Sequence, residues 1–246
     1  ISLALVCAVL VWTVGRPVSQ AETTTVIGYV VPDGPAAQAG LKPGDKILEV
    51  NRSPVTKFAG MGNMGQSVIW NVVRSEEPLI PVKFERDGKV QTVEVEPVTP
   101  EREGWGRRPL RQIGILPATT PMVAKIFPDS PAAAAGIRPR DLITAVDGEP
   151  LLSLASLSIF LNTHPAGEPI DLTVQRGDET LQLAVTPVVP EGEDKPRVGI
   201  LWDDRGVTVL EHPNPIQLVI GSVRTMVDTL SAVFSPRSDI KAEHLS

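Results

Sequence analysis

The chain contains three histidines, the side chain best suited to bind a metal ion or to act as a general base near neutral pH. His164, His212 and His244 lie far apart, in Thr-His-Pro, Glu-His-Pro and Glu-His-Leu contexts, and the sequence has no His-Glu-x-x-His or Gly-x-Ser-x-Gly motif. The single cysteine, Cys7, excludes an internal disulfide and a cysteine-cluster metal site. We therefore expect no catalytic residue and no metal ligand in this chain.

A thirty-residue segment occurs twice, at 26–55 and 122–151. The two copies align without a gap at an offset of 96, and 12 of 30 positions are identical. Because this period is too long for a solenoid, it indicates two copies of one small domain. The identical pairs are Pro32/Pro128, Asp33/Asp129, Pro35/Pro131, Ala36/Ala132, Ala37/Ala133, Ala39/Ala135, Gly40/Gly136, Pro43/Pro139, Asp45/Asp141, Ile47/Ile143, Val50/Val146 and Pro54/Pro150.

Each copy predicts the same succession of short elements. An apolar strand leads into a Pro-Asp turn, then Pro-Ala-Ala-x-Ala forms one helical turn, and the following glycine ends it in a left-handed conformation. A second strand and a longer helix follow, at about Met64–Val73 and Ser156–Asn162, and alternating hairpins at 80–97 and 170–187 close the copies. At the hairpins the offset has fallen to 90, so the second copy is six residues shorter in its middle stretch.

The shared motif Pro-Ala-Ala-x-Ala-Gly-Leu/Ile, with Gly-Asp-x-Ile after it, resembles the bacterial, circularly permuted form of the PDZ domain. The resemblance covers both copies, roughly residues 16–190. Arg140 departs from the pattern, which has glycine there as at Gly44, and we expect a different turn conformation at Arg140. The resemblance implies a mostly β fold with short helices (α+β), in which two tandem circularly permuted PDZ domains are flanked by a truncated transmembrane helix and an amphipathic helix.

A PDZ domain binds an extended peptide between a strand edge and its longer helix. The resemblance places the carboxylate-binding loop of the second copy at Ile113, Gly114 and Ile115, where glycine lets backbone N–H groups converge on an anion. In the first copy it implies a loop that begins at Gly15 and Arg16. Ile159 is the candidate helix-side wall, with core packing as its alternative role. The candidate peptide-binding residues are Gly15, Arg16, Ile113, Gly114, Ile115 and Ile159.

The two ends of the chain are apolar in different ways. Ile1–Val14 has no charge and, as a helix, would be about 21 Å long, short of the roughly 30 Å hydrocarbon core. We expect the end of a transmembrane helix, with a buried core helix as the alternative. Residues 214–236 place nine apolar side chains on one helical face. We expect this helix to lie at the membrane, and a helix that caps the second domain is equally compatible with the pattern.

Charge excludes one class of partner. The 246 residues carry a net charge of −6 and no basic stripe with interleaved aromatics, so we expect no nucleic-acid partner. The predicted organisation is the end of a transmembrane helix at 1–15, a first PDZ domain at 16–100, a linker at 101–111, a second PDZ domain at 112–190, a hairpin-like connector at 191–213, and an amphipathic membrane-proximal helix and tail at 214–246.

This order of parts resembles the site-2 protease family, intramembrane zinc metalloproteases such as the bacterial regulator-of-sigma-E protease. The resemblance implies zinc in the full-length protein but none bound by this fragment, with the catalytic motifs outside it. It implies the bacterial inner membrane, with the PDZ domains facing the periplasm or outside. The implied partners are the membrane and a protein or peptide substrate, a membrane-spanning protein already trimmed by another protease, which the PDZ region would gate.

Two alternatives belong to other classes. One is a non-catalytic, membrane-anchored PDZ scaffold that recruits partners. The other is the PDZ end of a trypsin-like periplasmic protease, although such a chain would not be expected to continue into a strongly amphipathic helix. The sequence upstream of Ile1 would separate the three, because each places a different motif, or none, before the repeats.

Overall fold

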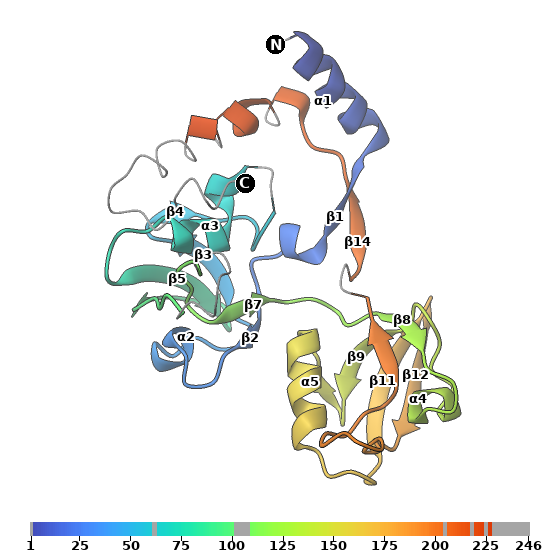
Figure 1. Ribbon diagram of the computed structural model, residues 1–246. Helices are drawn as coiled ribbons and strands as arrows, with labels where there is room; N and C mark the ends of the chain where they lie inside the picture. The colour runs from blue at the N-terminus through green and yellow to red at the C-terminus, as the bar shows by residue number, and fades with distance from the viewer. Residues whose placement is uncertain are drawn as a thin grey trace. The chain divides into compact units, whose positions relative to one another are not determined.

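The computed structural model describes residues 2–60, 63–100, 109–203, 206–216, 219–223 and 226–227. The chain divides into two compact units. The first unit comprises Ile1–Ala118 and the chain from Thr208 on, and the second unit comprises Thr119–Val207. In each unit a small sheet is accompanied by short helices (Figure 1). The expectation of a mostly β fold with short helices is confirmed.

The first unit is built around a four-stranded antiparallel sheet in the order β4-β3-β5-β6. Two further strand pairs, β2 with β7 and β1 with β14, complete it. Its elements are α1 (Ser2–Val14), β1 (Arg16–Ser19), the 3-10 helix η1 (Gln20–Glu22), β2 (Ile27–Val30), α2 (Pro35–Gln38), β3 (Lys46–Val50), β4 (Ser53–Pro54), the 3-10 helix η2 (Met64–Gln66), α3 (Val68–Val73), β5 (Ile80–Arg86), β6 (Lys89–Val95), β7 (Ile115–Pro117) and β14 (Thr208–Glu211).

The second unit repeats this plan. Its four-stranded sheet has the order β10-β9-β11-β12, and β13 pairs with β8 as β7 pairs with β2. Its elements are β8 (Val123–Ile126), α4 (Pro131–Ala134), β9 (Leu142–Val146), β10 (Glu149–Pro150), α5 (Leu154–Thr163), β11 (Ile170–Arg176), β12 (Glu179–Val185) and β13 (Ile200–Trp202).

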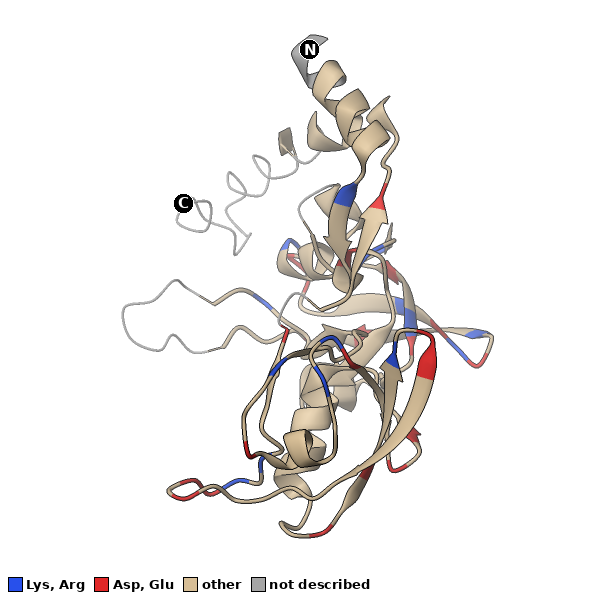
Figure 2. Ribbon diagram, turned by 90° about the vertical axis from the view of Figure 1, so that its right-hand side faces the viewer, with Lys and Arg blue, Asp and Glu red and all other residues tan. Residues whose placement is uncertain are grey.

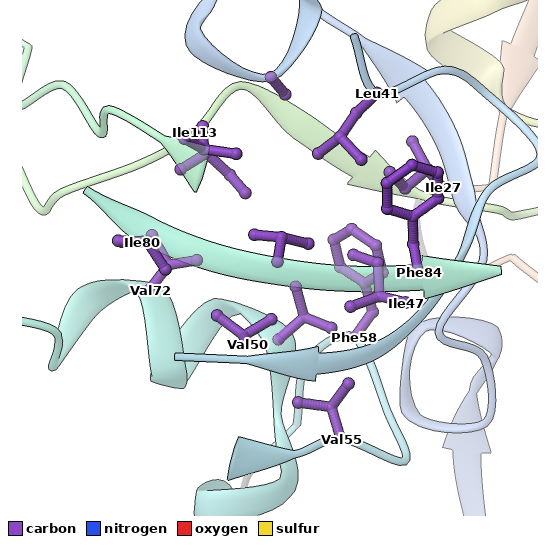
Figure 3. Close-up of a cluster of buried hydrophobic side chains, with 14 residues drawn as sticks. Ile27, Leu41, Ile47, Val50, Val55, Phe58, Val72, Ile80, Phe84 and Ile113 are labelled. Atoms are coloured by element: carbon purple, nitrogen blue, oxygen red, sulfur yellow. The ribbon is translucent and has the colours of Figure 1, made fainter. Parts of the chain in front are cut away.

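The structure groups the strands at both ends of the predicted second domain, 112–190, differently from the prediction. Strand β7 lies after residue 112, yet it pairs antiparallel with β2 and belongs to the first unit. Ile113 is 2 % exposed and packs in the first core beside Ile27 and Leu41 (Figure 3). At the other end β13, which the prediction left in a connector, pairs with β8 inside the second unit. In both cases the hairpin of the repeat is followed by one more strand that covers the same core.

The predicted turns are confirmed in detail, with one correction. Gly40 and Gly136, which end the helical turns α2 and α4, both adopt positive φ. Arg140 does not change the turn as expected, since its φ of 73° lies in the same left-handed region as the 93° of Gly44. The N–H of Arg140 donates to the carbonyl of Val123 at 2.7 Å, and Gly44 makes the equivalent bond at 2.7 Å. The hydrogen bond thus holds arginine in a conformation that favours glycine.

We expect Arg140→Gly to raise the free energy of unfolding of the second unit by about 0.5–1 kcal/mol. The left-handed conformation costs arginine roughly 1–2 kcal/mol, and the greater freedom of glycine in the unfolded chain offsets part of the gain. Urea denaturation followed by circular dichroism measures the change. The reciprocal variant Gly44→Arg should destabilise the first unit, and a lower stability in both variants would contradict the proposed strain at Arg140.

Each unit holds a buried aspartate in an arginine fork. Asp141 is 1 % exposed and accepts two bonds from Arg176, at 2.8 and 2.7 Å, and one from the Arg138 N–H at 2.8 Å. Arg176 also donates to the carbonyl of Gly136 at 2.8 Å. Burial alone would raise the pKa of Asp141, but the hydrogen bonds from Arg176 and Arg138 outweigh it and the pKa is lowered. The fork therefore ties the turn after α4 to the end of β11.

The first unit has the same fork. Asp45 is 1 % exposed and accepts two bonds of 2.6 Å from Arg86 and one of 2.8 Å from the Lys42 N–H. Arg86 donates in addition to the carbonyl of Gly40 at 2.8 Å. The aspartate of the repeated motif is therefore a structural residue in both copies.

We expect Asp141→Asn to lower the free energy of unfolding at pH 7 by about 2 kcal/mol, because it removes a charged acceptor from three donors. Since the folded protein lowers the pKa of Asp141, its contribution is present above the unfolded pKa of about 3.9 and is lost as the pH falls through the folded pKa. Urea titrations should therefore show the two proteins converging below about pH 4. Asp178→Asn, at an exposed turn, is the control, and an undiminished difference at low pH would refute the assignment.

Strands β1 and β14 join distant parts of the first unit as a two-stranded ribbon. They pair antiparallel from Arg16 opposite Glu211 to Ser19 opposite Thr208. The Arg16 guanidinium contacts the Glu211 carboxylate at 2.7 Å, and Figure 2 shows a basic and an acidic position together on this pair of strands. A ring nitrogen of His212 lies 2.8 Å from the carbonyl oxygen of Trp12 in α1. We refer to this pair of strands as the β1–β14 ribbon.

The ends of the chain are helical where the structure describes them. Helix α1 covers Ser2–Val14, and short helical stretches occur between residues 215 and 227; the predicted residues 228–236 lie outside the described ranges. No helix among the described residues combines the length and the apolar character needed to cross a membrane. The described part of the C-terminal stretch belongs to the first unit, so the alternative of a helix that caps the second domain is wrong for these residues.

Candidate functional site

In the first unit a glycine loop precedes an exposed strand edge. The carbonyl of Ile113 accepts a bond from the Ala36 N–H at 2.9 Å, and the carbonyl of Gly114 accepts one from the Val31 N–H at 2.8 Å. Gly114 has a φ of 75°. Within the described ranges the N–H groups of Ile113 and Gly114 donate to no acceptor. The carbonyls are thus fixed inward while two successive N–H groups are left for a ligand.

The second unit contains the same loop at Val198 and Gly199. The Ala132 N–H donates to the carbonyl of Val198 at 2.9 Å, and the Phe127 N–H donates to that of Gly199 at 3.0 Å. Gly199 has a φ of 78°, and a Cβ at this position would lie 2.2 Å from the Cβ of Ser130. Only glycine fits this close approach. Here too, the N–H groups of the two loop residues have no acceptor in the described part of the chain.

A strand edge and a helix border each loop. Among the described strands β7 pairs only with β2, and β13 only with β8, so one edge of each remains open for a further strand. Val198 shares its hydrophobic cluster with Leu157 and Leu161 of α5, and Ile200 packs against that cluster. In the first unit Ile113 shares its cluster with Val68 and Val72 of α3 in the same way. Loop, strand edge and helix therefore border one apolar core in each unit.

Alternation along the two strands distinguishes a core-facing side from an outer side. Ile115 and Ile200, directly after the loop glycines, are half-buried and pack against the cores. Leu116 and Leu201 are 45 % and 51 % exposed and lie on the other face. The side chain nearest to a ligand on the loop N–H groups is therefore Ile115 in the first unit and Ile200 in the second.

Ile113, Gly114 and Ile115 belong to the first unit, whereas the sequence placed them in the second repeat. Among the described residues their loop and β7 bond to the backbone of the first unit, as the contacts with Ala36 and Val31 show. The corresponding loop of the second repeat, Val198–Ile200, was missed. The similarity of Arg111-Gln-Ile-Gly-Ile-Leu to Arg197-Val-Gly-Ile-Leu is a signal that could have identified it.

Gly15 and Arg16 do not form a carboxylate loop. The N–H of Gly15 donates to the carbonyl of Val11 at 2.8 Å, and the φ of 79° ends helix α1. A Cβ on Gly15 would lie 2.6 Å from Cγ of Leu210, so β14 occupies the space beside it. Arg16 pairs with Glu211 at 2.7 Å. Gly15 therefore ends α1 and Arg16 begins the β1–β14 ribbon.

Ile159 lies on α5 and is 39 % exposed, outside the hydrophobic cluster of the second unit. It is two positions from each of the buried residues Leu157 and Leu161, so it points to the opposite side of the helix. The alternative of core packing is therefore wrong, and its contact with a ligand stays a prediction.

An arginine lies directly upstream of each loop. Arg111 donates to the carbonyl of Glu77 at 2.8 Å and to that of Ser75, just after α3, and so ties the start of the first loop to the end of that helix. Arg197 makes a local bond to the carboxylate of Glu193 at 2.6 Å.

The described residues contain no group of three or more His, Cys, Asp or Glu side chains that could hold a metal ion. His164 stacks on Phe160 with ring centroids 5.3 Å apart, and His212 contacts the carbonyl of Trp12. His244 lies outside the described ranges. We therefore assign no metal ligand to the described part of this chain.

Comparison with protein families identifies both repeats. PDZ-domain models match residues 104–186 and residues 26–66. A Neisseria meningitidis protein named as a zinc metalloprotease is 31 % identical over 198 residues, 79 % of this chain and 43 % of that protein. The regulator-of-sigma-E protease of Salmonella typhimurium is 27 % identical over 72 % of this chain and 38 % of its own length.

A second kind of relative matches through the same region. The periplasmic serine endoprotease DegP of Salmonella typhimurium is 28 % identical over 66 % of this chain and 34 % of its own length. The chain thus spans less than half of the length of each of these three relatives. The longer and more identical match is to the zinc metalloprotease. The chain thus contains two PDZ domains and, over much of its length, is similar to zinc metalloproteases of the site-2 protease type.

Proposed function

We propose that this chain is the substrate-recognising PDZ region of a membrane-embedded zinc metalloprotease that acts in regulated intramembrane proteolysis. The observation that carries the proposal is the pair of matching loops at Ile113–Ile115 and Val198–Ile200, each beside an open strand edge. The zinc expected for the full-length protein would be held by residues outside the described part of this chain, and its role would be hydrolytic. The two PDZ domains would be circularly permuted, as the resemblance predicts, but with the loop strands β7 and β13 after the hairpins of their repeats.

Each groove has the chemistry to bind the C-terminus of a peptide. Two successive N–H groups beside a left-handed glycine form a concave site that favours an anion such as a carboxylate. The open edge of β7 or β13 offers main-chain partners to an extended chain. The half-buried Ile115 and Ile200 beside the loop favour an apolar last residue. A protein that has been cut by another protease presents such a new C-terminus.

The apolar ends support a place at a membrane. Helix α1 exposes Val6, Val9, Leu10, Trp12 and Val14 with exposed fractions of 41–71 %. The described C-terminal residues expose a second set, Ile216, Ile220, Val223, Met226 and Val227, at 56–65 %. Soluble surfaces seldom leave this much apolar area uncovered. We infer that both sets face lipid or membrane helices, at the bacterial inner membrane, with the PDZ domains on the periplasmic side.

The proposed task of the two domains is to gate access to the protease. Their described residues include no group of side chains that could hold a metal ion, and their proposed grooves are suited to binding a peptide. We infer that a substrate with an intact outer domain is excluded and that a trimmed, membrane-spanning substrate is admitted. A scaffold without protease activity is less well supported, because the zinc metalloprotease match extends over 79 % of the chain.

The first test is peptide binding by the whole 246-residue chain in detergent. We expect a fluorescein-labelled decapeptide with a free C-terminal valine to bind at two sites per chain in isothermal titration calorimetry, and its C-terminal amide to bind at least about tenfold more weakly. Ile200→Asp should leave one site, because a carboxylate beside the loop repels that of the peptide. The matched control is Leu201→Asp, on the outer face of the same strand, which should leave two sites. Equal affinity of acid and amide would refute carboxylate recognition.

The second test concerns gating in the full-length protein. In the test variant a short Gly-Ser linker replaces residues 24–206. A short linker can close this gap because Ser19 and Thr208, which flank it, are paired at the end of the ribbon. Zinc content and cleavage of a trimmed membrane-protein substrate should be retained. Cleavage of the same substrate with its outer domain intact should rise toward the trimmed rate in a reconstituted assay. Loss of activity on the trimmed substrate would instead show that the domains are needed for the reaction itself.

A further inference from the structure

The first repeat has a longer connection than the second before its groove helix. Residues 55–67 join β4 to α3, whereas residues 151–153 join β10 to α5. This is where the offset between the copies falls from 96 to 90. The hairpins that follow have equal lengths, since β5, β6, β11 and β12 each contain 7 residues. The extra residues of the first copy therefore lie between β4 and α3.

One end of this connection binds η1, which directly follows the β1–β14 ribbon. The carbonyl of Ala21 accepts bonds from the N–H groups of Phe58, at 2.9 Å, and Ala59, at 3.0 Å. Gly60 has a φ of 117°, and a Cβ on it would lie 2.5 Å from Cγ of Glu22. The side chain of Glu22 is thus seated against the bare backbone of Gly60.

A charge cluster connects the same end to the ribbon. Arg16 lies 2.7 Å from Glu211 and 3.5 Å from Glu22. Lys57 is only 7 % exposed. Burial lowers the pKa of Lys57, Glu22 and Glu211 act to raise it, and Arg16 acts to lower it. The charges opposite to that of the buried lysine therefore come from Glu22 of η1 and from Glu211 of β14.

The other end of the connection contacts the C-terminal segment. Gly221 is buried, and a Cβ on it would lie 3.5 Å from the Cβ of Asn63. Asn63 has a φ of 50° and begins η2, and its carbonyl accepts a bond from Gln66 at 3.1 Å. The segment that follows the ribbon therefore packs closely, backbone against side chain, on the residue from which η2 starts.

The connection also binds the first turn of the groove helix α3. The Val68 N–H donates to the carbonyl of Lys57 at 3.0 Å, and the Ile69 N–H donates to that of Phe58 at 3.1 Å. Ser67 caps the helix by accepting from the Trp70 N–H at 3.3 Å, and its hydroxyl donates to Phe58 at 2.9 Å. These bonds satisfy N–H groups that a helix of 6 residues cannot satisfy itself. Helix α5 of the second unit starts with the same kind of serine cap, Ser153 accepting from the Ser156 N–H at 3.1 Å, so the bonds to Lys57 and Phe58 are what is particular to α3.

We propose that Lys57–Gly60 and Asn63 form a docking surface, present in the first repeat alone, that binds the chain's own flanking segments and thereby sets the order of groove helix α3. The occupants are η1 with the β1–β14 ribbon on one side and the segment around Gly221 on the other. Displacing either segment loosens α3 and the first peptide groove, and leaves α5 and the second groove unchanged. The link to peptide affinity rests on the proposed function, whereas the effect on α3 does not.

Hydrogen–deuterium exchange on the whole 246-residue chain in detergent micelles tests this surface without any peptide. Gly60→Ala should displace Glu22 and accelerate exchange of the amides of residues 70–73 by at least about tenfold, with the amides of α5 unchanged. The matched control is Gly88→Ala, where φ is also positive, at 74°, but no atom lies within 4 Å of the new Cβ. It should leave α3 as in the wild type.

A second variant approaches the surface from the other side. Gly221→Leu should press on Asn63 and accelerate the same α3 amides, while Val223→Leu, on the exposed side of that segment, should not. Unchanged α3 exchange in both Gly60→Ala and Gly221→Leu would overturn the proposal, and so would an equal acceleration in α3 and α5, which reports global destabilisation. Because the readout needs no ligand, an absence of peptide binding would count against the proposed function alone.

Discussion

The organisation of each repeat depends on one backbone hydrogen bond, from the first turn of its short helix to the residue before the loop glycine. Ala36 donates to Ile113, and Ala132 donates to Val198, both at 2.9 Å. The donor is an N–H that a helical turn of four residues leaves without an internal partner, and the acceptor lies two residues before the last strand of the same repeat. This bond closes the core and fixes the loop carbonyl inward. The N–H groups of the loop, which we propose as ligand donors, have no acceptor within the described ranges.

The two units use the same closure but differ in what surrounds it. Each has its aspartate–arginine fork and its left-handed turn, so the repeated motif is mainly a device for stability. The residues proposed to bind a ligand belong to a second, much shorter repeat, Ile-Gly-Ile and Val-Gly-Ile, which lies outside the thirty-residue alignment. Both groove helices start at a serine cap, but α3 also donates to the carbonyls of Lys57 and Phe58 in the connection before it. The residues that stabilise the fold and those proposed for recognition and control thus lie in separate parts of the sequence.

The parts of the fold that local backbone chemistry decides could be predicted from the sequence. Proline at the start of α2 and α4, and glycine where they end, identify those turns without any knowledge of the tertiary structure. Strand partners far apart in sequence could not be predicted in the same way. The segment at Ile113 follows one copy and precedes the other, and only the pairing of β7 with β2 decides between them.

Two individual positions show the same limit. Arg140 suggests a different turn by its residue type, yet a tertiary hydrogen bond to Val123 retains the turn that glycine makes at position 44. Gly15 and Arg16 have the composition of an anion-binding loop, but they lie where a helix ends and a strand begins. Whether a glycine caps a helix or lines a groove depends on which strand lies beside it. That neighbour, β14, comes from a part of the chain nearly two hundred residues away.

The β1–β14 ribbon can form only late during synthesis of the chain. Arg16 and Glu211 are 195 positions apart, and the whole of the second unit lies between them. A ribosome makes residues 119–207 before it makes β14, so the second unit can fold while β1 still lacks its partner. A folded insert shortens the flexible loop that the ribbon must close, which lowers the entropic cost of closure. The first unit is the first to be synthesised and the last to complete its folding. Until β14 is made, the unpaired edge of β1 is exposed to any chaperone or neighbouring chain that binds strands.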